Sequence, residues 1–314
     1  MTHTPVLVSE VLEIFRPKPA DTLLDTTIGH GGHAQAFLEA APGTKVIGLD
    51  ADAAALKVAR KTLAKFSDRV SLVHANFANL KDALRGGGIV EPSAKFSHIL
   101  FDLGVGSHQL ADKERSFSFT STGPLAMKFG AGGEEEDVAA LLGRLSERDL
   151  ADIIREYGEE RFAGRIAHAI KLSLPITSGQ QLARIIADAL PRRFQKIHPA
   201  TRTFQALRIA VNRELESLKT GLAQALELLA PGGRLAVISF HSLEDRIVKN
   251  FFRDRKDTLE IVTKKPIQAG EEEKSNNPRS RSAKLRAAKT KIKQTHDSKH
   301  PAKRSTSQPS WSKN

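Results

Sequence analysis

The chain has 314 residues and a net charge of +12, and 40% of its residues are hydrophobic. This length is sufficient for one large domain with an insertion or for two domains, and the absence of cysteine excludes disulfides and thiolate metal sites. No basic region followed by a long apolar stretch opens the chain, and no apolar run reaches the roughly 18 residues of a membrane span. We therefore expect a cytoplasmic protein that does not enter a membrane.

The first predicted elements lead into a glycine-rich loop. Apolar spacing over Val6–Phe15 predicts a short amphipathic helix, and Leu23–Asp25 then predicts a buried strand. Residues 26–33 are predicted to form a tight loop whose backbone N–H groups can face a ligand. A helix is predicted to follow from Ala34. The glycine spacing also fits a dinucleotide-binding loop or a connection without a ligand. Asp25 favours S-adenosylmethionine (SAM), because a carboxylate repels a pyrophosphate but suits an ammonium and a sulfonium.

A second predicted strand, Lys45–Asp50, also ends in a carboxylate. Asp50 lies 25 residues after Asp25, and an acidic side chain there can accept both ribose hydroxyls of a nucleoside. The alternative role for Asp50 is a helix N-cap. Asp52 is better placed to cap the helix predicted over Ala53–Phe66, so we favour ribose binding for Asp50.

Two more strands complete the first half of the predicted sheet. Val70–His74 is the third strand, and Phe77 after it either frames an adenine ring or belongs to the core. His98–Gly104 is the fourth strand and contains Asp102. The carboxyl ends of parallel strands meet at one edge of a sheet, where ligands bind. Three strand-terminal carboxylates therefore predict a cleft at this edge.

The pattern changes between residues 111 and 197, where no strand alternates with the predicted helices. Helical spacing runs through Val138–Leu142, Glu147–Tyr157, Glu159–Leu172 and Gln180–Ala189. We predict an inserted helical substrate-recognition domain at 111–197 within a discontinuous sheet domain formed by 1–110 and 198–290.

The sheet pattern returns after residue 198. The predicted elements are a helical stretch at Ala200–Leu229, a strand at Arg234–Phe240, a capping box at Ser242–Asp245 that opens a helix at Arg246–Phe252, weaker strands at Thr258–Thr263 and Ala283–Ala288, and a polar loop at Gly270–Pro278. Alternating strands and helices with parallel strand order predict an α/β, Rossmann-like fold.

Most of the positive charge lies near the C-terminus. Lys274 to Asn314 hold 12 lysines and arginines and one acidic residue, whereas the rest of the chain holds 36 basic and 35 acidic residues. The composition of residues 291–314 predicts a basic, disordered tail. Such a tail typically binds a polyanion with release of counterions; the alternative is a tail that only keeps the protein in solution.

Seven segments together resemble one family, the RsmH (MraW) type of bacterial 16S rRNA (cytosine-N4)-methyltransferase. They are Thr4–Leu7, Asp25–His33, Gly48–Asp52, Phe101–Val105, Gly158–Phe162, His198–Ala206 and Ile238–Arg246. The resemblance covers roughly Thr4 to Lys289, and its last two segments are highly specific. It implies a class I SAM-dependent methyltransferase that modifies the N4 amine of a cytidine in the decoding region of small-subunit ribosomal RNA.

The resemblance also implies roles for particular residues. The cofactor side comprises Gly31, Gly32 and His33 at the methionine part of SAM, Asp50 at the ribose, Phe77 at the adenine, and Asp102 and Gln109 completing the pocket. Arg202, Arg208, His241 and Ser242 are implied for the RNA side, although helix caps and helix-face charges are the alternative for these four. We expect Asp102 to accept a hydrogen of the target amine, and no cluster at ligand spacing calls for a metal.

Two segments depart from the family pattern. Arg115–Phe119 reads RSFSF where the family usually has RGFSF, and Gly123–Gly130 reads GPLAMKFG where it usually has GPLDMRMD. Ala126 and Gly130 thus replace two carboxylates, and Lys128 replaces an arginine. If a missing carboxylate orients the target amine, activity is reduced or the substrate differs, while SAM binding is kept.

The departures keep alternative functions open. One is a SAM-dependent methyltransferase of another RNA or of a protein, and another is an RNA-binding assembly factor that has lost turnover. A nucleotide-dependent oxidoreductase is a more distant alternative. The expected partner is 16S rRNA within the small ribosomal subunit, and a homodimer is considered as well.

Overall fold

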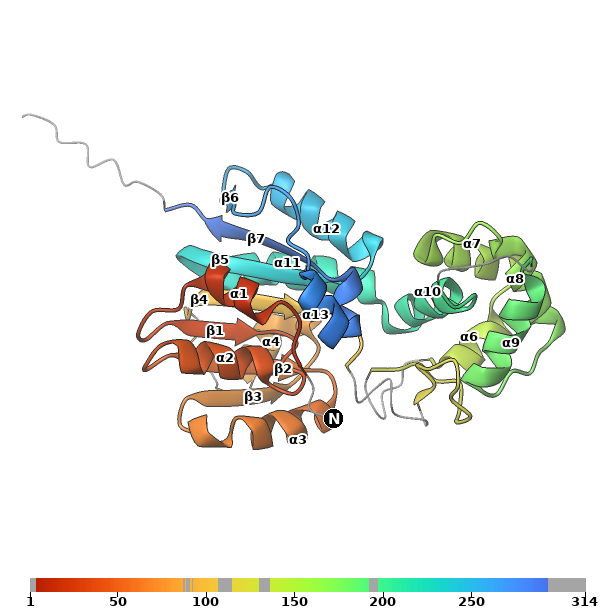
Figure 1. Cartoon of the computed structure of the whole chain (residues 1–314), viewed down its shortest axis with the longest axis horizontal. Helices are drawn as coiled ribbons and strands as arrows, with labels where there is room; N and C mark the ends of the chain where they lie inside the picture. Colours follow the sequence, from red (N-terminus) through yellow and green to blue (C-terminus); the bar gives the residue numbers. More distant parts are fainter. Residues whose placement is uncertain are drawn as a thin grey trace, which may run out of the picture.

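A seven-stranded sheet in the order β3-β2-β1-β4-β5-β7-β6 forms the centre of the larger part of the molecule (Figure 1). The computed structural model describes residues 4–86, 88, 91, 93–106, 115–129, 136–191 and 197–292. Its strands are β1 (Thr22–Asp25), β2 (Lys45–Asp50), β3 (Val70–His74), β4 (Phe96–Asp102), β5 (Leu229–Ser239), β6 (Leu259–Ile261) and β7 (Lys284–Thr290). Strands β1 to β5 pair in parallel, and β7 is antiparallel to both β5 and β6. The predicted α/β, Rossmann-like fold is confirmed.

Helices cover both faces of this sheet. They include α1 (Val8–Phe15), α2 (Gly32–Ala40), α3 (Ala53–Thr62), α4 (Leu80–Gly86), α11 (Glu214–Leu228) and α12 (Ser242–Arg253). The first three share one core cluster and the last three share another. Successive side chains of β4 point to opposite faces of the sheet. Leu100 therefore belongs to the first core cluster, while Ile99 and Phe101 belong to the second.

The strand register brings the three predicted carboxylates to one edge. Strand β1 lies between β2 and β4, and Asp25 at its end is level with Gly48 and Leu100. Asp50 is the last residue of β2 and Asp102 the last of β4. The predicted gathering of carboxylates at the carboxyl edge is therefore confirmed.

A second group of helices lies beside the sheet, to the right in Figure 1. These helices are α6 (Val138–Arg144), α7 (Glu147–Gly158), α8 (Ala163–Leu172), α9 (Gly179–Ala189) and α10 (Thr201–Asn212). They share a core cluster of their own, to which α10 contributes Phe204 and Leu207. The predicted start of a helix at Glu159 is wrong, because Glu159 adopts a left-handed backbone with φ 49° and α8 begins only at Ala163.

Two other expectations for the C-terminal part need correction. The segment expected as a polar loop contains a short helix, α13 (Glu271–Asn276), and a 3₁₀ helix, η4 (Pro278–Ser282). The capping box of α12 is shifted by one residue: the N-cap is His241 and its partner is Glu244. A histidine ring nitrogen accepts the backbone N–H here in place of a serine hydroxyl.

The positive charge is also less confined to a tail than expected. Arg286 of β7 forms an ion pair of 2.6 Å with Asp245, and Lys289 forms one of 3.1 Å with Glu260. Three of the 12 basic residues of the segment 274–314, Lys284, Arg286 and Lys289, thus belong to β7 of the sheet. The predicted disordered tail falls almost wholly outside the described residues. No helix within the described ranges is long and apolar enough to cross a membrane.

Candidate functional site

A cavity of about 370 Å³ lies at the carboxyl edge of β1, β2 and β4. Its lining includes six of the residues expected at the ligands, which are Gly32, His33, Asp50, Phe77, Asp102 and Arg208. Four others, Gly31, Arg202, His241 and Ser242, are not among the lining residues. Gln109 lies outside the described residues.

The glycine loop brings the backbone close to the cavity. Gly29 and Gly31 have φ of 52° and 85°, a conformation that favours glycine. A Cβ on Gly32 would lie 2.7 Å from the side chain of Pro5. A side chain at this position would therefore push away the N-terminal segment that forms part of the cavity wall.

Asp50 is oriented by two backbone groups. Its Oδ2 accepts the N–H of Gly29 at 2.9 Å, and its Oδ1 accepts the N–H of Asp52 at 2.8 Å. A carboxylate oxygen can accept more than one hydrogen bond, so this orientation is compatible with a ribose hydroxyl as a donor to Asp50. Asp52 caps α3 by accepting the N–H of Ala54 at 2.9 Å, so the predicted division of roles between Asp50 and the cap residue is compatible with the structure.

His33 and Asp102 face one another across 3.6 Å, from Nδ1 to Oδ2. The Nε2 atom of His33 lies 2.8 Å from the carbonyl oxygen of Val6, and because a carbonyl only accepts, Nε2 carries the proton. Burial lowers the pKa of His33, so the ring is neutral and Nδ1 presents a lone pair to Asp102. Burial, and then the Glu244 carboxylate, raise the pKa of Asp102 to about 7. Asp102 can therefore exchange a proton near neutral pH.

Asp25 is hydrogen-bonded to the glycine-rich loop but does not line the cavity. It is 1% exposed, and its Oδ1 accepts the N–H of Thr27 at 3.2 Å. Burial raises its pKa to about 7, although the neighbouring His33 acts in the opposite direction. A bound cation would shift this balance toward the ionised carboxylate.

Phe77 packs against the core and also lines the cavity. Its ring packs edge-on against Phe101, with centroids 5.6 Å apart, and a Cβ on Gly221 of α11 would lie 2.9 Å from it. The contact with the core is thus confirmed. Phe77 also lines the cavity, which is compatible with the predicted contact to an adenine ring.

The last turn of α10 forms the opposite wall. Arg208 donates two hydrogen bonds, of 2.7 and 2.9 Å, to the carboxylate of Glu214. Asn212 accepts the N–H of Phe129 at 2.9 Å and donates to the carbonyl of Met127 at 2.8 Å. These contacts place the half-buried Phe129 ring in the cavity wall.

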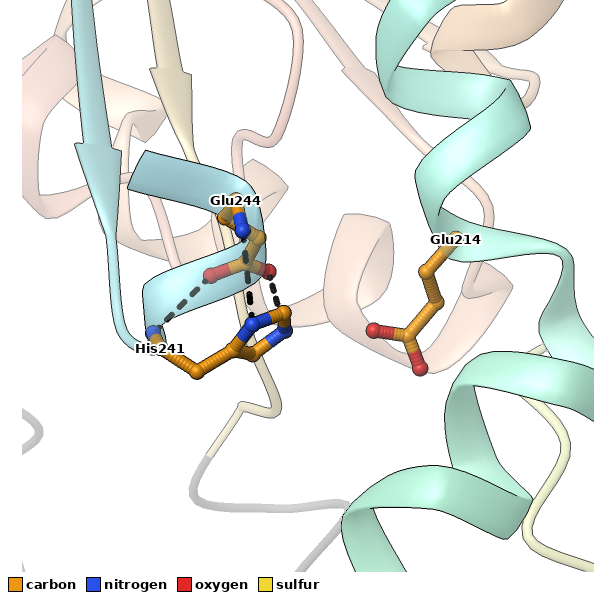
Figure 2. Close-up of side chains that lie close together, drawn as sticks. All are labelled: Glu214, His241 and Glu244. Atoms are coloured by element: carbon orange, nitrogen blue, oxygen red, sulfur yellow. Dashed lines mark hydrogen bonds and ion pairs between the residues drawn. The ribbon is translucent and has the colours of Figure 1, made fainter. Parts of the chain in front are cut away.

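Next to this wall, Glu214, His241 and Glu244 bring ligand-type atoms within 4.8 Å of one another (Figure 2). The Nδ1 atom of His241 accepts the N–H of Glu244 at 3.4 Å, which leaves the proton on Nε2, 3.2 Å from Oε1 of Glu244. With this tautomer the ring offers no lone pair to an ion, and Glu214 is already engaged by Arg208. We interpret the cluster as a network of ion pairs and hydrogen bonds, and the absence of a metal stays a prediction.

Arg202 and Ser242 both contact the turn between α7 and α8. Arg202 donates to the backbone carbonyl of Glu159 at 3.1 Å, and the Ser242 hydroxyl donates to its carboxylate at 2.5 Å. Sequence reasoning had not connected these residues. The sequence analysis also assigns no ligand role to five cavity residues, Phe129, Asn212, Glu214, Glu244 and Arg279, because only the fold brings them together, although Phe129 and Glu244 lie within segments compared with the family pattern.

The amino-acid sequence matches one family model and relatives of one name. The MraW methylase family matches residues 1–291. The ribosomal RNA small subunit methyltransferase H of Cyanothece sp. is 48% identical over 286 residues, with 91% of this chain and 94% of that protein covered. The protein of the same name from Thermotoga neapolitana is 48% identical over 293 residues, with 91% and 95% covered. A solved rRNA methylase from Streptococcus thermophilus superposes with a TM-score of 0.42 at 12% identity, covering 93% of this chain and 99% of that one.

Proposed function

The chain belongs to the MraW methylase family, and from this premise we propose that it transfers a methyl group from SAM to the N4 amine of a cytidine in the decoding region of 16S rRNA. The observation that carries the proposal is the cavity at the carboxyl edge, where Asp50 and Asp102 stand at the ends of two parallel strands beside the glycine loop. Relatives named ribosomal RNA small subunit methyltransferase H supply the substrate class.

The cofactor side of the cavity suits SAM. Asp50, already oriented by two backbone N–H groups, would accept the ribose hydroxyls. Phe77 would pack against the adenine, and Gly31, Gly32 and His33 would surround the methionine part. When bound, SAM supplies a methyl group made electrophilic by its sulfonium.

Asp102 is the proposed acceptor for the target amine. The N4 lone pair of cytosine is delocalised into the ring, so accepting a hydrogen from this amine localises the pair and raises its nucleophilicity. As nitrogen gains the methyl group it must release one proton, and a carboxylate with a pKa of about 7 can take it. His33, held by the hydrogen bond of its Nε2 to the carbonyl of Val6, would pack against Asp102, with its Nδ1 3.6 Å from Oδ2.

The opposite wall would receive the flipped-out cytidine. Arg208 is the one of the four expected RNA-side residues that lines the cavity. We propose that residues 111–197 form the inserted substrate-recognition domain and that Arg202, His241 and Ser242 shape the approach of the RNA. The contacts of Arg202 and Ser242 with Glu159 support an indirect role for these two. The proposed substrate is 16S rRNA within the small ribosomal subunit in the cytoplasm.

The test is the modification state of the RNA. Nucleosides from 16S rRNA of cells with and without this protein are compared by mass spectrometry, and N4-methylated cytidine should disappear in the deletion strain and return with the wild-type gene. Complementation with Asp102→Asn should not restore it. An unchanged nucleoside profile would redirect the proposal to another RNA or to a protein, an alternative kept open by Ala126 and Gly130 in place of the usual carboxylates.

A further inference from the structure

One wall of the cavity is built from both ends of the described chain. The N–H of Leu7 donates to Oε1 of Glu273 at 2.9 Å, and the side-chain amide of Asn277 donates to the carbonyl of Thr4 at 3.1 Å. The two residues of the first contact are 266 positions apart in the sequence, and those of the second contact are 273 positions apart. The two contacts hold α13 and η4 against the N-terminal segment, whose Pro5 packs on Gly32 of the glycine loop.

Arg279 of η4 lies in this wall and lines the cavity. It is half-buried, and its positive charge lowers the pKa of Asp102, which lines the same cavity. Within the ranges that the structure describes, Arg279 makes no hydrogen bond or ion pair with a protein group. A half-buried guanidinium without such a partner is well placed to bind an anion.

Two of the other lining groups that carry or can gain positive charge are less available than Arg279. Arg208 is the other arginine in the described lining, and its guanidinium already donates two hydrogen bonds to Glu214. His33 is a neutral ring whose N–H is bound to the carbonyl of Val6. Among the lining residues that the structure describes, Arg279 is therefore the guanidinium that remains for a ligand.

The chemistry of SAM indicates which of its groups Arg279 can bind. The methionine end of SAM carries an ammonium and a carboxylate on the same carbon atom, so it needs an acidic and a basic group side by side. Arg279 can supply the basic group: it lines the same cavity as Gly32, and Asn277 beside it is bonded to Thr4, next to the Pro5 that packs on Gly32, where the methionine part is proposed to lie. We propose that Arg279 binds the carboxylate of SAM, an inference that rests on the proposed SAM-dependent function.

The experiment measures binding rather than turnover. SAM and decarboxylated SAM, which differ by this carboxylate alone, are titrated calorimetrically into wild-type protein and into Arg279→Met. Wild type should bind decarboxylated SAM about tenfold or more weakly than SAM, as expected for a lost charge-assisted hydrogen bond. Arg279→Met should bind SAM about tenfold or more weakly than wild type and should bind decarboxylated SAM with unchanged affinity.

Arg281→Met is the matched control, because Arg281 belongs to the same 3₁₀ helix but is exposed and is not part of the cavity lining. It should bind both compounds as wild type does. An equal loss for both compounds in Arg279→Met would overturn the proposal, since it would mean a general disturbance of the wall. Unchanged SAM affinity together with weakened 16S rRNA binding would overturn it in favour of an RNA phosphate. Failure of wild type to bind either compound would instead reject the proposed function itself.

Discussion

The hydroxyl of Ser242 donates a hydrogen bond of 2.5 Å to the carboxylate of Glu159 and so joins the first turn of α12 to the turn between α7 and α8. Arg246 adds a bond of 2.8 Å to the same carboxylate, and Arg202 binds the backbone carbonyl of Glu159. Glu159 adopts a left-handed backbone conformation at this point. Glu159 therefore connects the helical region with the sheet region through Ser242 and Arg246 of α12, whereas Arg202 contacts it from within the helical region.

This contact predicts that Ser242 acts through Glu159. We expect Ser242→Ala and Glu159→Gln each to lower the free energy of unfolding by less than about 1 kcal/mol, because the ion pairs of Glu159 are exposed. Both should leave SAM affinity unchanged, and the double variant should bind small-subunit particles no worse than either single variant. Weakened particle binding by Ser242→Ala alone, with Glu159→Gln unaffected, would show that Ser242 contacts the RNA directly.

Asp50→Ala should weaken SAM binding by about tenfold or more, because it removes the acceptor for the ribose hydroxyls. The substitution also frees the N–H groups of Gly29 and Asp52, so the glycine loop loses part of its support. Calorimetric titration with SAM should therefore be accompanied by a melting curve. A folded Asp50→Ala protein with wild-type SAM affinity would remove Asp50 from the site.

The environment of Asp102 predicts how the stability of the folded protein depends on pH. Burial and Glu244 raise its pKa from 3.8 to about 7 in the folded protein. The folded state therefore binds this proton more tightly than the unfolded state, and the resulting stability is present below pH 4 and is lost as the pH rises to about 7. Asp102→Asn mimics the protonated form, so its stability should match that of wild type near pH 4 and exceed it at pH 8, by an amount on the order of 4 kcal/mol.

The ionisation of Asp102 should also make the rate of methylation depend on pH. Single-turnover methylation by wild type should rise with pH toward a plateau above about 7, because Asp102 must be ionised to accept the proton. The Asp102→Asn variant should be slow at every pH and should lack this rise. A wild-type rate that does not change between pH 5.5 and 8 would exclude Asp102 as the acceptor.

The elements that could be predicted from the sequence are those with strong local patterns. Strands β2 and β3 have the predicted bounds, because apolar runs between turn residues leave little freedom in their ends. The meeting of Asp25, Asp50 and Asp102 at one edge was also predictable, since it needs only parallel strands of this order.

The remaining features depend on contacts between distant segments. Helix α13 has six polar or charged residues and no apolar periodicity, and Glu273 in it is held by Leu7 at the other end of the chain. Arg279 follows it in a basic segment where no arginine stands out locally. Likewise, His241 as a helix cap was missed because cap rules favour Ser, Thr, Asp and Asn.

The C-terminal segment predicts a salt-dependent contribution to RNA binding. Truncation before Gln294 removes Lys299, Lys303, Arg304 and Lys313 together with one acidic residue. Affinity for 16S rRNA should fall, and its dependence on salt concentration should flatten, because fewer counterions are released. The melting temperature should stay unchanged, since the cut lies beyond β7. Identical salt slopes before and after truncation would mean that the tail does not bind RNA.

The last prediction concerns the two missing carboxylates. Ala126 is half-buried and is not among the cavity-lining residues. Its carbonyl accepts the N–H of Val138, the first residue of α6, at 3.2 Å. Gly130 lies outside the described residues. We therefore expect wild type to be active, and Ala126→Asp with Gly130→Asp to change thermal stability while leaving the methylation rate and SAM affinity as they are.

Single-turnover methylation of small-subunit particles decides between the two roles. Wild type, the double variant and the double variant with Lys128→Arg are compared, because lysine offers a point charge where arginine offers a planar fork that can hold a carboxylate through two hydrogen bonds. If the carboxylates only pair with basic neighbours, the third protein should be the most stable and all three rates should agree. A rate that rises in the double variant at constant SAM affinity would instead mean that one of the carboxylates orients the target amine, and that this chain methylates more slowly because it lacks it.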